Sequence, residues 1–176
     1  MSKLNHQTHD AQIMLASDHQ RGFSAYELTM HTPKGNRSYR AALTLPTEAS
    51  AHTLELFALT AALQTLNKAK REQLTGASGR APRIEVLTKD AAFADGLRSV
   101  LSAGAETPLR AGGNFKDAAL KQFSRFSIDV MVEQDNSIFV LRNWGQQHVF
   151  DPKEILGADA IFGPAAVGAL APSYQF

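Results

Sequence analysis

The sequence predicts one α/β domain: a mixed five-stranded sheet flanked by helices, in the order β-β-β-α-β-α-α-β, with a C-terminal extension. Two early segments alternate apolar and polar residues around a turn, as a hairpin does. A long segment without glycine or proline then repeats apolar residues at three- and four-residue steps, which is typical of an amphipathic helix. Two later apolar runs, separated by helical patterns, indicate further strands. With 176 residues, the chain is long enough to bury the core of such a domain.

The first part of the chain is expected to form a polar arm followed by three strands. Residues 1–11 are interpreted as a flexible arm, and the apolar run 13–16 as a buried strand. Residues 23–31 and 37–45 alternate, and proline, glycine and asparagine occur between them at 32–36. This arrangement predicts an antiparallel hairpin.

A long helix is predicted from about Ala51 to Leu74. Pro46 ends the preceding strand, and Ser50 is a suitable N-cap. One face of this helix carries an apolar stripe formed by Leu59, Ala62, Leu63 and Leu66. The stripe indicates the face that packs against the sheet.

The next segments repeat the pattern of strand and helix. Residues 84–87 are expected to form a buried strand, followed by a helix over about 90–102. A further helix is predicted over about 114–126, for which Asn114 is a good cap, and a fifth strand over 128–132. The alternation of strands with helices completes the predicted sheet.

The C-terminal part has a weaker pattern. Residues 12–135 are expected to form the domain, and residues 136–176 an extension that packs on it or trails from it. A turn signal before residues 138–144 predicts an extra antiparallel strand there.

The amino-acid composition excludes several classes of functional site. The absence of cysteine excludes disulfides, thiol catalysis and cysteine-ligated metals, so any metal must be held by carboxylates or histidine. No apolar stretch has membrane-spanning length and the polar start is unlike a signal peptide, so a cytoplasmic protein without a membrane partner is expected. The net charge of +1 weighs against a dedicated polycation for nucleic acid.

Three carboxylates occupy related places in this arrangement. Asp18 ends the first strand, Asp90 follows the fourth, and Glu55 lies near the start of the long helix on its apolar stripe. Strand ends and helix starts gather at one rim of an open sheet, where ligands bind. Carboxylates that converge without cationic partners need divalent ions, and oxygen ligands suit Mg²⁺ or Mn²⁺. Two such ions can clamp the attacking and leaving oxygens of a phosphodiester.

The segments around these acids resemble the ribonuclease H family. The likeness rests on LASD at 15–18 with Gly22 in the following loop, TLELFALTAAL at 53–63, and VLTKD at 86–90. It covers roughly residues 12–135. The resemblance implies the ribonuclease H fold and identifies the family's metal-binding, catalytic carboxylates with Asp18, Glu55 and Asp90.

The chain departs from the family at positions that contact an RNA–DNA hybrid. Members that cut hybrids usually carry small and amide residues where this chain has His19-Gln20-Arg21, Ala51-His52 and Ala91-Ala92. Recognition of RNA 2′-hydroxyls is therefore left open. The candidate nucleic-acid contacts near these positions are His19, Gln20, Arg21, His52 and Lys89.

Two further roles have weaker candidates. The family's fourth carboxylate lies on a C-terminal helix, and no motif matches it here; Asp135 is the nearest candidate for an additional metal ligand. His148 is a candidate proton shuttle because imidazole titrates near neutral pH, although a surface histidine is the simpler interpretation.

These features predict a ribonuclease H-like nuclease that hydrolyses phosphodiester bonds with two Mg²⁺ or Mn²⁺ ions, acting on an RNA–DNA hybrid, RNA or DNA. The alternative is a catalytically inactive module of the same fold that binds nucleic acid or acts as a scaffold among protein partners in a larger nucleic-acid-processing complex. The missing hybrid contacts, the unplaced fourth acid and the modest charge favour this alternative. A small-molecule α/β protein has no support, because no glycine-rich phosphate loop follows a strand.

Overall fold

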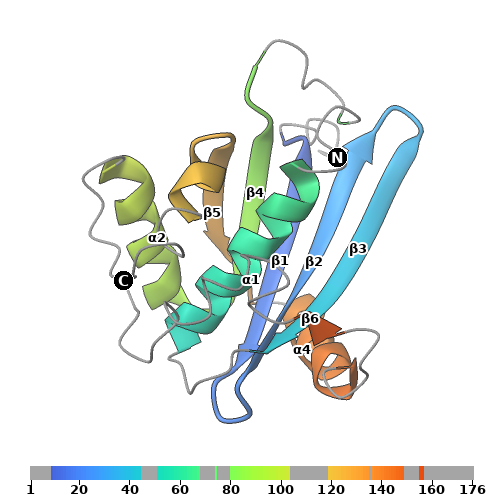
Figure 1. Ribbon diagram of the computed structural model, residues 1–176, viewed down its shortest axis with the longest axis vertical. Coiled ribbons are helices and arrows are strands. Elements are labelled where there is room, and N and C mark those ends of the chain that lie inside the picture. The colour runs from blue at the N-terminus through green and yellow to red at the C-terminus, as the bar shows by residue number, and fades with distance from the viewer. Residues whose placement is uncertain are drawn as a thin grey trace.

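The structure is a computed structural model that describes residues 9–44, 51–67, 74, 80–103, 119–134, 136–148 and 155–156. These residues form one mixed sheet with helices on both faces (Figure 1). Helices α1 (Ala51–Thr65) and α2 (Ala91–Ala103) cover one face, and α4 (Asn136–His148) packs on the other. Among the described helices, none has the length and apolar character needed to span a membrane.

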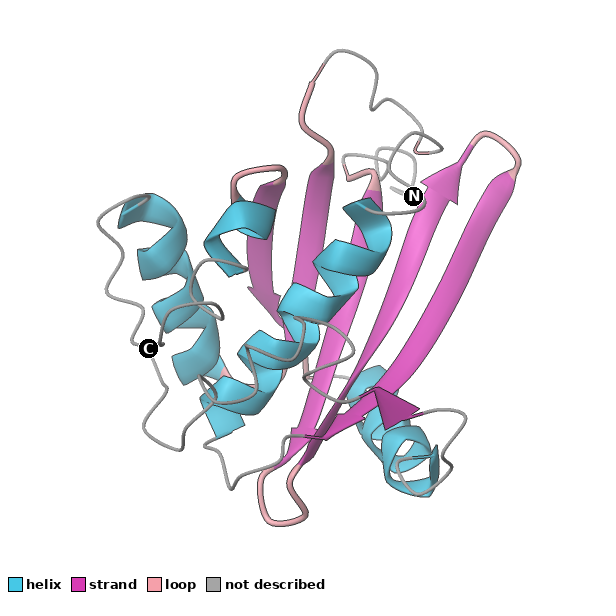
Figure 2. Ribbon diagram, viewed as in Figure 1, coloured by secondary structure: helices cyan, strands magenta, loops and turns pink. Residues whose placement is uncertain are grey.

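The sheet has the strand order β5-β4-β1-β2-β3-β6 (Figure 2). Its strands are β1 (Ala11–Asp18), β2 (Phe23–Thr32), β3 (Gly35–Thr44), β4 (Arg83–Thr88), β5 (Ser127–Val132) and β6 (Ile155–Leu156). The first three strands are antiparallel neighbours, whereas β4 runs parallel to β1 and β5 parallel to β4. The order 3-2-1-4-5 is that of the ribonuclease H fold, so the predicted fold class is confirmed. The short β6, which pairs in parallel with β3, was not predicted.

The β2–β3 hairpin forms where the alternating pattern predicts it, with a tighter turn. Thr32 pairs with Gly35, so Pro33 and Lys34 alone connect the strands. Gly35 has a φ of 111°, a conformation that side chains with a Cβ rarely adopt. The Thr32 hydroxyl donates to the Gly35 carbonyl at 2.6 Å and accepts from the Lys34 amide at 3.2 Å. These bonds stabilise the turn.

The first strand is buried on both faces because helices cover both sides of the sheet at this point. Ala11, Ile13 and Leu15 belong to the main core together with residues of α1 and α2. Met14 and Ala16 pack with residues of α4 instead. Successive side chains of a strand point to opposite faces, so odd-numbered residues of β1 face α1 and even-numbered ones face α4.

Helix α1 buries the predicted stripe, but it is shorter than predicted. The stripe residues are all fully buried: Leu59, Ala62, Leu63 and Leu66. The α-helix runs to Thr65 and continues as π-helix over residues 66–67, and Leu74, the predicted end, lies in a bend. The Thr65 hydroxyl donates to the Ala61 carbonyl at 3.0 Å, a bond that competes with the regular helix ladder. It also bonds the Tyr26 hydroxyl at 3.0 Å, which joins this helix end to β2.

The elements between α1 and α4 match the prediction where they are described. Helix α2 begins after Asp90, whose carboxylate caps it by accepting the Phe93 amide at 3.1 Å. Residues 119–123 are helical, as expected for the end of the 114–126 helix, whereas Asn114 lies outside the described residues. Strand β5 extends the predicted run by one residue.

The predicted strand at 138–144 is wrong, because these residues belong to helix α4. Ile138 and Leu141 are buried and Trp144 is half-buried, whereas Phe139 and Val140 are exposed. This three-residue spacing follows a helical face rather than the two-residue period of a strand. Both patterns fit a short apolar run, so the turn signal before it was not decisive.

A glycine lets α4 approach the sheet closely. A Cβ at Gly145 would lie 3.0 Å from side-chain atoms of both Phe23 and Ala25 on β2. Any larger residue would therefore push the helix away from the sheet.

The predicted flexible arm also ends earlier than residue 11. Ala11 is the first residue of β1, and Asp10 is buried. The Asp10 carboxylate accepts from the Arg83 amide at 2.8 Å and from the Arg80 guanidinium at 3.0 Å. These bonds attach the start of β1 to the start of β4.

Candidate functional site

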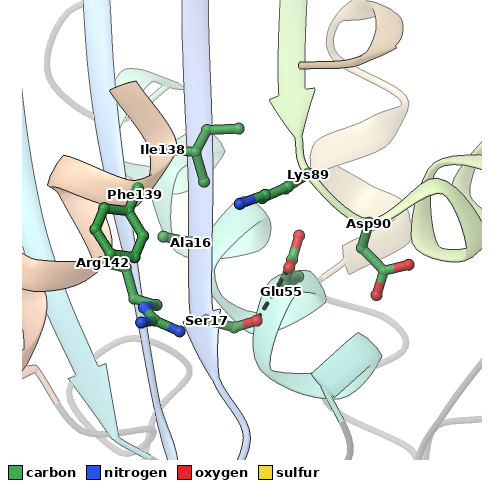
Figure 3. Close-up of a pocket in the computed structure, with 8 residues that line it drawn as sticks. All are labelled: Ala16, Ser17, Glu55, Lys89, Asp90, Ile138, Phe139 and Arg142. Atoms are coloured by element: carbon green, nitrogen blue, oxygen red, sulfur yellow. Dashed lines mark hydrogen bonds between the residues drawn. The ribbon is translucent and has the colours of Figure 1, made fainter. Parts of the chain in front are cut away.

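A cavity of about 240 Å³ lies at the rim where β1 and β4 end (Figure 3). The two strands are parallel neighbours, so their carboxyl ends lie at the same edge of the sheet. The cavity is lined by Ala16, Ser17, Glu55, Lys89, Asp90, Ile138, Phe139 and Arg142. Residues of β1, α1, the β4–α2 junction and α4 thus meet at the place where this type of sheet binds ligands.

Glu55 is a buried carboxyl group at the base of this cavity. It is 5% exposed and accepts hydrogen bonds from the Ser17 hydroxyl at 3.0 Å and the Thr88 hydroxyl at 2.6 Å. Burial raises the pKa of Glu55 to about 7, although the two hydroxyls oppose the shift and the nearby Asp90 carboxylate adds to it. At neutral pH the group is therefore close to half protonated.

Thr88 connects the two predicted carboxylates that share the cavity. Its hydroxyl donates to Glu55 and accepts from the Asp90 amide at 3.1 Å. Asp90 is in turn fixed by its role as the cap of α2. Glu55 and Asp90, two of the predicted site residues, therefore lie together at the rim.

Asp18 does not join them. Its side chain lies on the α4 face of β1, like those of Met14 and Ala16; Ala16 lines the cavity, whereas Asp18, further along the strand, does not. Its carboxylate accepts from the Arg21 guanidinium at 2.9 Å and the Arg21 amide at 3.2 Å. Burial alone would raise the pKa of Asp18, but these bonds and the charges of Arg21 and Arg142 hold it below its ordinary value.

Asp18 thus has a structural role that accounts for its burial. Arg21, which it holds, also donates to the Gln146 side chain of α4 at 3.4 Å. The expected convergence of three carboxylates is corrected accordingly: the β1–β2 turn is joined to α4 through Asp18, and only two of the acids share the cavity.

Ser17 is the polar β1 residue that lines the cavity, next to Ala16, and sequence reasoning missed it. A shift of one residue along a strand moves a side chain to the other face. The run 13–16 is apolar throughout because β1 is buried on both faces, so it carries no alternation that distinguishes position 17 from position 18. The buried Glu55, which needs hydrogen-bond donors, was the only available signal.

Two cations lie on the α4 side of the cavity. Lys89 Nζ is 6.0 Å from the centroid of the Phe139 ring, and Arg142 Cζ is 5.2 Å from it. Figure 3 shows the Lys89 ammonium extending toward α4, whereas the Asp90 carboxylate points away from it. Arg142 and Phe139 were missed because their segment was predicted to be a strand. Helix α4 contains no acidic residue at all.

The other predicted site residues lie elsewhere or outside the description. His19, Gln20 and Arg21 form the exposed turn after β1, and Arg21 is held by Asp18. His52 lies in the first turn of α1, and His148 is the last residue of α4. The side chains of both are outside the described part of the structure. Asp135 is also outside them.

The side chains present do not fit a pair of Mg²⁺ or Mn²⁺ ions. In the described parts of the chain, no three histidine, aspartate or glutamate side chains come close enough to hold a metal. The β1 side chains that line the cavity are those of Ala16 and Ser17, Asp18 is not among the lining residues, and two cations are. Two divalent ions would need more carboxylate oxygens than this cavity provides.

Comparison with known proteins gives similarity in fold. No protein family model and no curated protein matches the chain. Among solved structures, RNase H1 from the halophilic archaeon Halobacterium salinarum is 16% identical, with a TM-score of 0.46, over 78% of this chain and 96% of that one. The foamy viral protease-reverse transcriptase in complex with double-stranded DNA is 11% identical, with a TM-score of 0.48, over 81% and 96%.

A third similar structure is the N-terminal RNase H domain of Rv2228c from Mycobacterium tuberculosis, solved as a fusion with maltose-binding protein. It is 13% identical, with a TM-score of 0.41, over 79% of this chain and 99% of that one. At these identities and TM-scores no activity is carried over to this chain.

Proposed function

We propose that this chain, which has a ribonuclease H-like fold, is a nucleic-acid-binding domain whose rim cavity binds the sugar-phosphate backbone without metal catalysis. The observation that carries the proposal is the charge of the cavity wall. Lys89 and Arg142 line the cavity where a metal-dependent site would need further carboxylates, and Asp18 is paired with Arg21 and does not line it. Phosphate contacts by lysine and arginine supply most of the sequence-independent affinity for nucleic acid.

The remaining polar groups of the cavity suit binding better than hydrolysis. Both carboxyl oxygens of Glu55 accept hydroxyl hydrogen bonds, and one Asp90 oxygen accepts the Phe93 amide. These carboxyl groups are thus used in holding β1, β4, α1 and α2 together at the rim. The cations remain as the groups that attract a ligand of negative charge.

Binding is tested with the purified full chain by fluorescence anisotropy. The probes are labelled single-stranded DNA, single-stranded RNA, duplex DNA and an RNA–DNA hybrid, each titrated with EDTA present. We expect binding that weakens as salt is raised, and weaker binding by the K89E variant than by K121E. Lys121 is an exposed lysine of the 119–123 helical segment and serves as the control. Absence of binding to all four probes at low salt would refute the proposal.

A second candidate is the metal-dependent nuclease predicted from the sequence, with Asp18, Glu55 and Asp90 as its carboxylates and Mg²⁺ or Mn²⁺ as its metal. The observation that favours it is that Glu55 and Asp90 line one cavity. Its test is cleavage of the same four probes with Mn²⁺ by the wild type and by D18N, E55Q and D90N. Cleavage that is lost in all three variants would establish the nuclease, and cleavage unchanged by D18N and D90N would exclude this assignment.

A further inference from the structure

We propose that Arg142 and Lys89 hold one phosphodiester group between them in the cavity beside Phe139, with the Arg142 Nε–H as the directing donor. This inference rests on the proposed function and identifies the chemical group that the cavity binds. It concerns residues of α4 and of the β4–α2 junction, which the backbone brings together from distant parts of the chain.

The first observation is a buried donor without an acceptor. The Nε atom of Arg142 is inaccessible to solvent and has no hydrogen-bond partner in the described structure. A buried N–H without a partner costs about 1–3 kcal/mol, and more when the group is charged. Because this Nε is closed to solvent, the guanidinium must turn about its side-chain torsions for the donor to meet an anionic oxygen in the cavity that Arg142 lines.

The second observation is a second cation at the same ring. Lys89 is exposed, and its ammonium lies 6.0 Å from the Phe139 ring that Arg142 contacts at 5.2 Å. The guanidinium offers directional donors, whereas lysine acts as a compact point charge. The pair therefore suits a tetrahedral phosphate group, to which Arg142 donates a directional hydrogen bond while Lys89 makes a less directional charge contact.

The third observation concerns the acids of the cavity. The carboxyl oxygens of Glu55 face the Ser17 and Thr88 hydroxyls, and its side chain is buried beneath them. Asp90 points away from the two cations in Figure 3. No ion pair within 4.0 Å joins Lys89 or Arg142 to a carboxylate among the described residues. Arg142 also lowers the pKa of Asp18, but Arg21 already pairs with that carboxylate, so the two cations keep positive charge for a ligand.

The test combines affinity with a signal from the donor itself. Nitrogen-15 NMR of the full chain observes the arginine Nε–H resonances, assigned by comparison with R142K. A single-stranded DNA 12-mer is titrated into wild type, R142K, R142Q, K89A and the control R83K. Arg83 is an exposed arginine at the opposite end of β4. Circular dichroism establishes that each variant is folded.

We expect the Arg142 Nε–H resonance to shift saturably with the DNA. R142Q is expected to bind at least tenfold more weakly, and its salt dependence (log Kd against log salt) to decrease by ~0.7, the value for one phosphate contact to a single strand. R142K, which keeps the charge but loses Nε–H, is expected to lose part of the affinity, and R83K none.

Two results would overturn the inference in distinguishable ways. Wild-type affinity in R142Q and K89A, with an unmoved Nε–H resonance, would refute this phosphate site while the domain's binding function stands. No binding of the 12-mer by the wild type, together with none in the four-probe titration, would refute the binding function itself. If R142Q fails to fold, the more conservative R142K still tests the phosphate site.

Discussion

Replacing Glu55 with glutamine tests the buried carboxyl group through its effect on stability. The pKa of Glu55 is raised from an ordinary value of 4.5 to about 7 in the folded protein. Between these two values the folded state binds a proton that the unfolded state has released. Stability therefore falls as pH rises through this window, and it levels off above pH 7.

The magnitude follows from the pKa difference. A difference of one unit corresponds to ~1.4 kcal/mol, so a change from 4.5 to about 7 corresponds to a loss of ~3 kcal/mol between pH 4 and pH 8. Glutamine cannot ionise, and its amide can still bond to the hydroxyls of Ser17 and Thr88, which both donate and accept. Poorer geometry of one hydrogen bond costs ~1 kcal/mol.

We therefore expect the curves of E55Q and wild type to cross. At pH 5 the wild type has already lost ~1 kcal/mol through ionisation in the unfolded state, so the two proteins should be about equally stable there, and at pH 8 the variant should be more stable by ~2 kcal/mol. Urea unfolding at constant ionic strength from pH 5 to 8 measures both curves. Asp18, whose pKa is lowered, and Tyr26, whose pKa is raised, titrate outside this range and leave the comparison undisturbed.

One result would refute this reasoning: a stability difference between E55Q and wild type that stays constant across the range, because Glu55 would then not carry the proton. Addition of Mg²⁺ supplies a second comparison. A metal bound at Glu55 would favour the ionised form and flatten the wild-type curve, whereas we expect no effect of Mg²⁺.

Three further predictions concern the sheet rim and its packing. S17D places a carboxylate beside Glu55 and should create Mn²⁺ binding measurable by calorimetry, which wild type and S17N lack; equal binding by wild type would contradict the assigned orientation of this position. D18N removes the buried charge that pairs with Arg21, whose side chain is 57% exposed, and should lower stability at pH 7 by about 1 kcal/mol after allowance for solvent screening. R21Q leaves the buried carboxylate without this partner and should be destabilised at least as much in thermal melts, and unchanged melts of both variants would contradict the pair. G145V should cost ~1–3 kcal/mol, because its Cβ meets β2 at 3.0 Å, and a variant as stable as wild type would show that α4 is not seated so closely.

The sequence predicted those elements whose signals are local. The hairpin follows from two alternating runs around a proline and a glycine, and Asp90 caps α2 through a bond within its own first turn. Helix α4 was missed because its short apolar run fits both the helical period and the two-residue period of a strand. Packing against β1 and β2 selects the helix. Thr65, the last residue of α1, bonds the hydroxyl of Tyr26, a residue distant in the chain that no local signal identifies.

By itself, the sequence determined the order of strands and helices as far as β5, and it brought Glu55 and Asp90 to one rim, since strand ends and helix starts are local properties. Only the tertiary structure decided which of two adjacent side chains, Ser17 or Asp18, faces that rim. A strand that is buried on both faces has no polar side to mark its orientation, so this choice depends on which helix packs on which face. The same packing placed Arg142 opposite the carboxyl groups, and with it the charge that the cavity presents to a ligand.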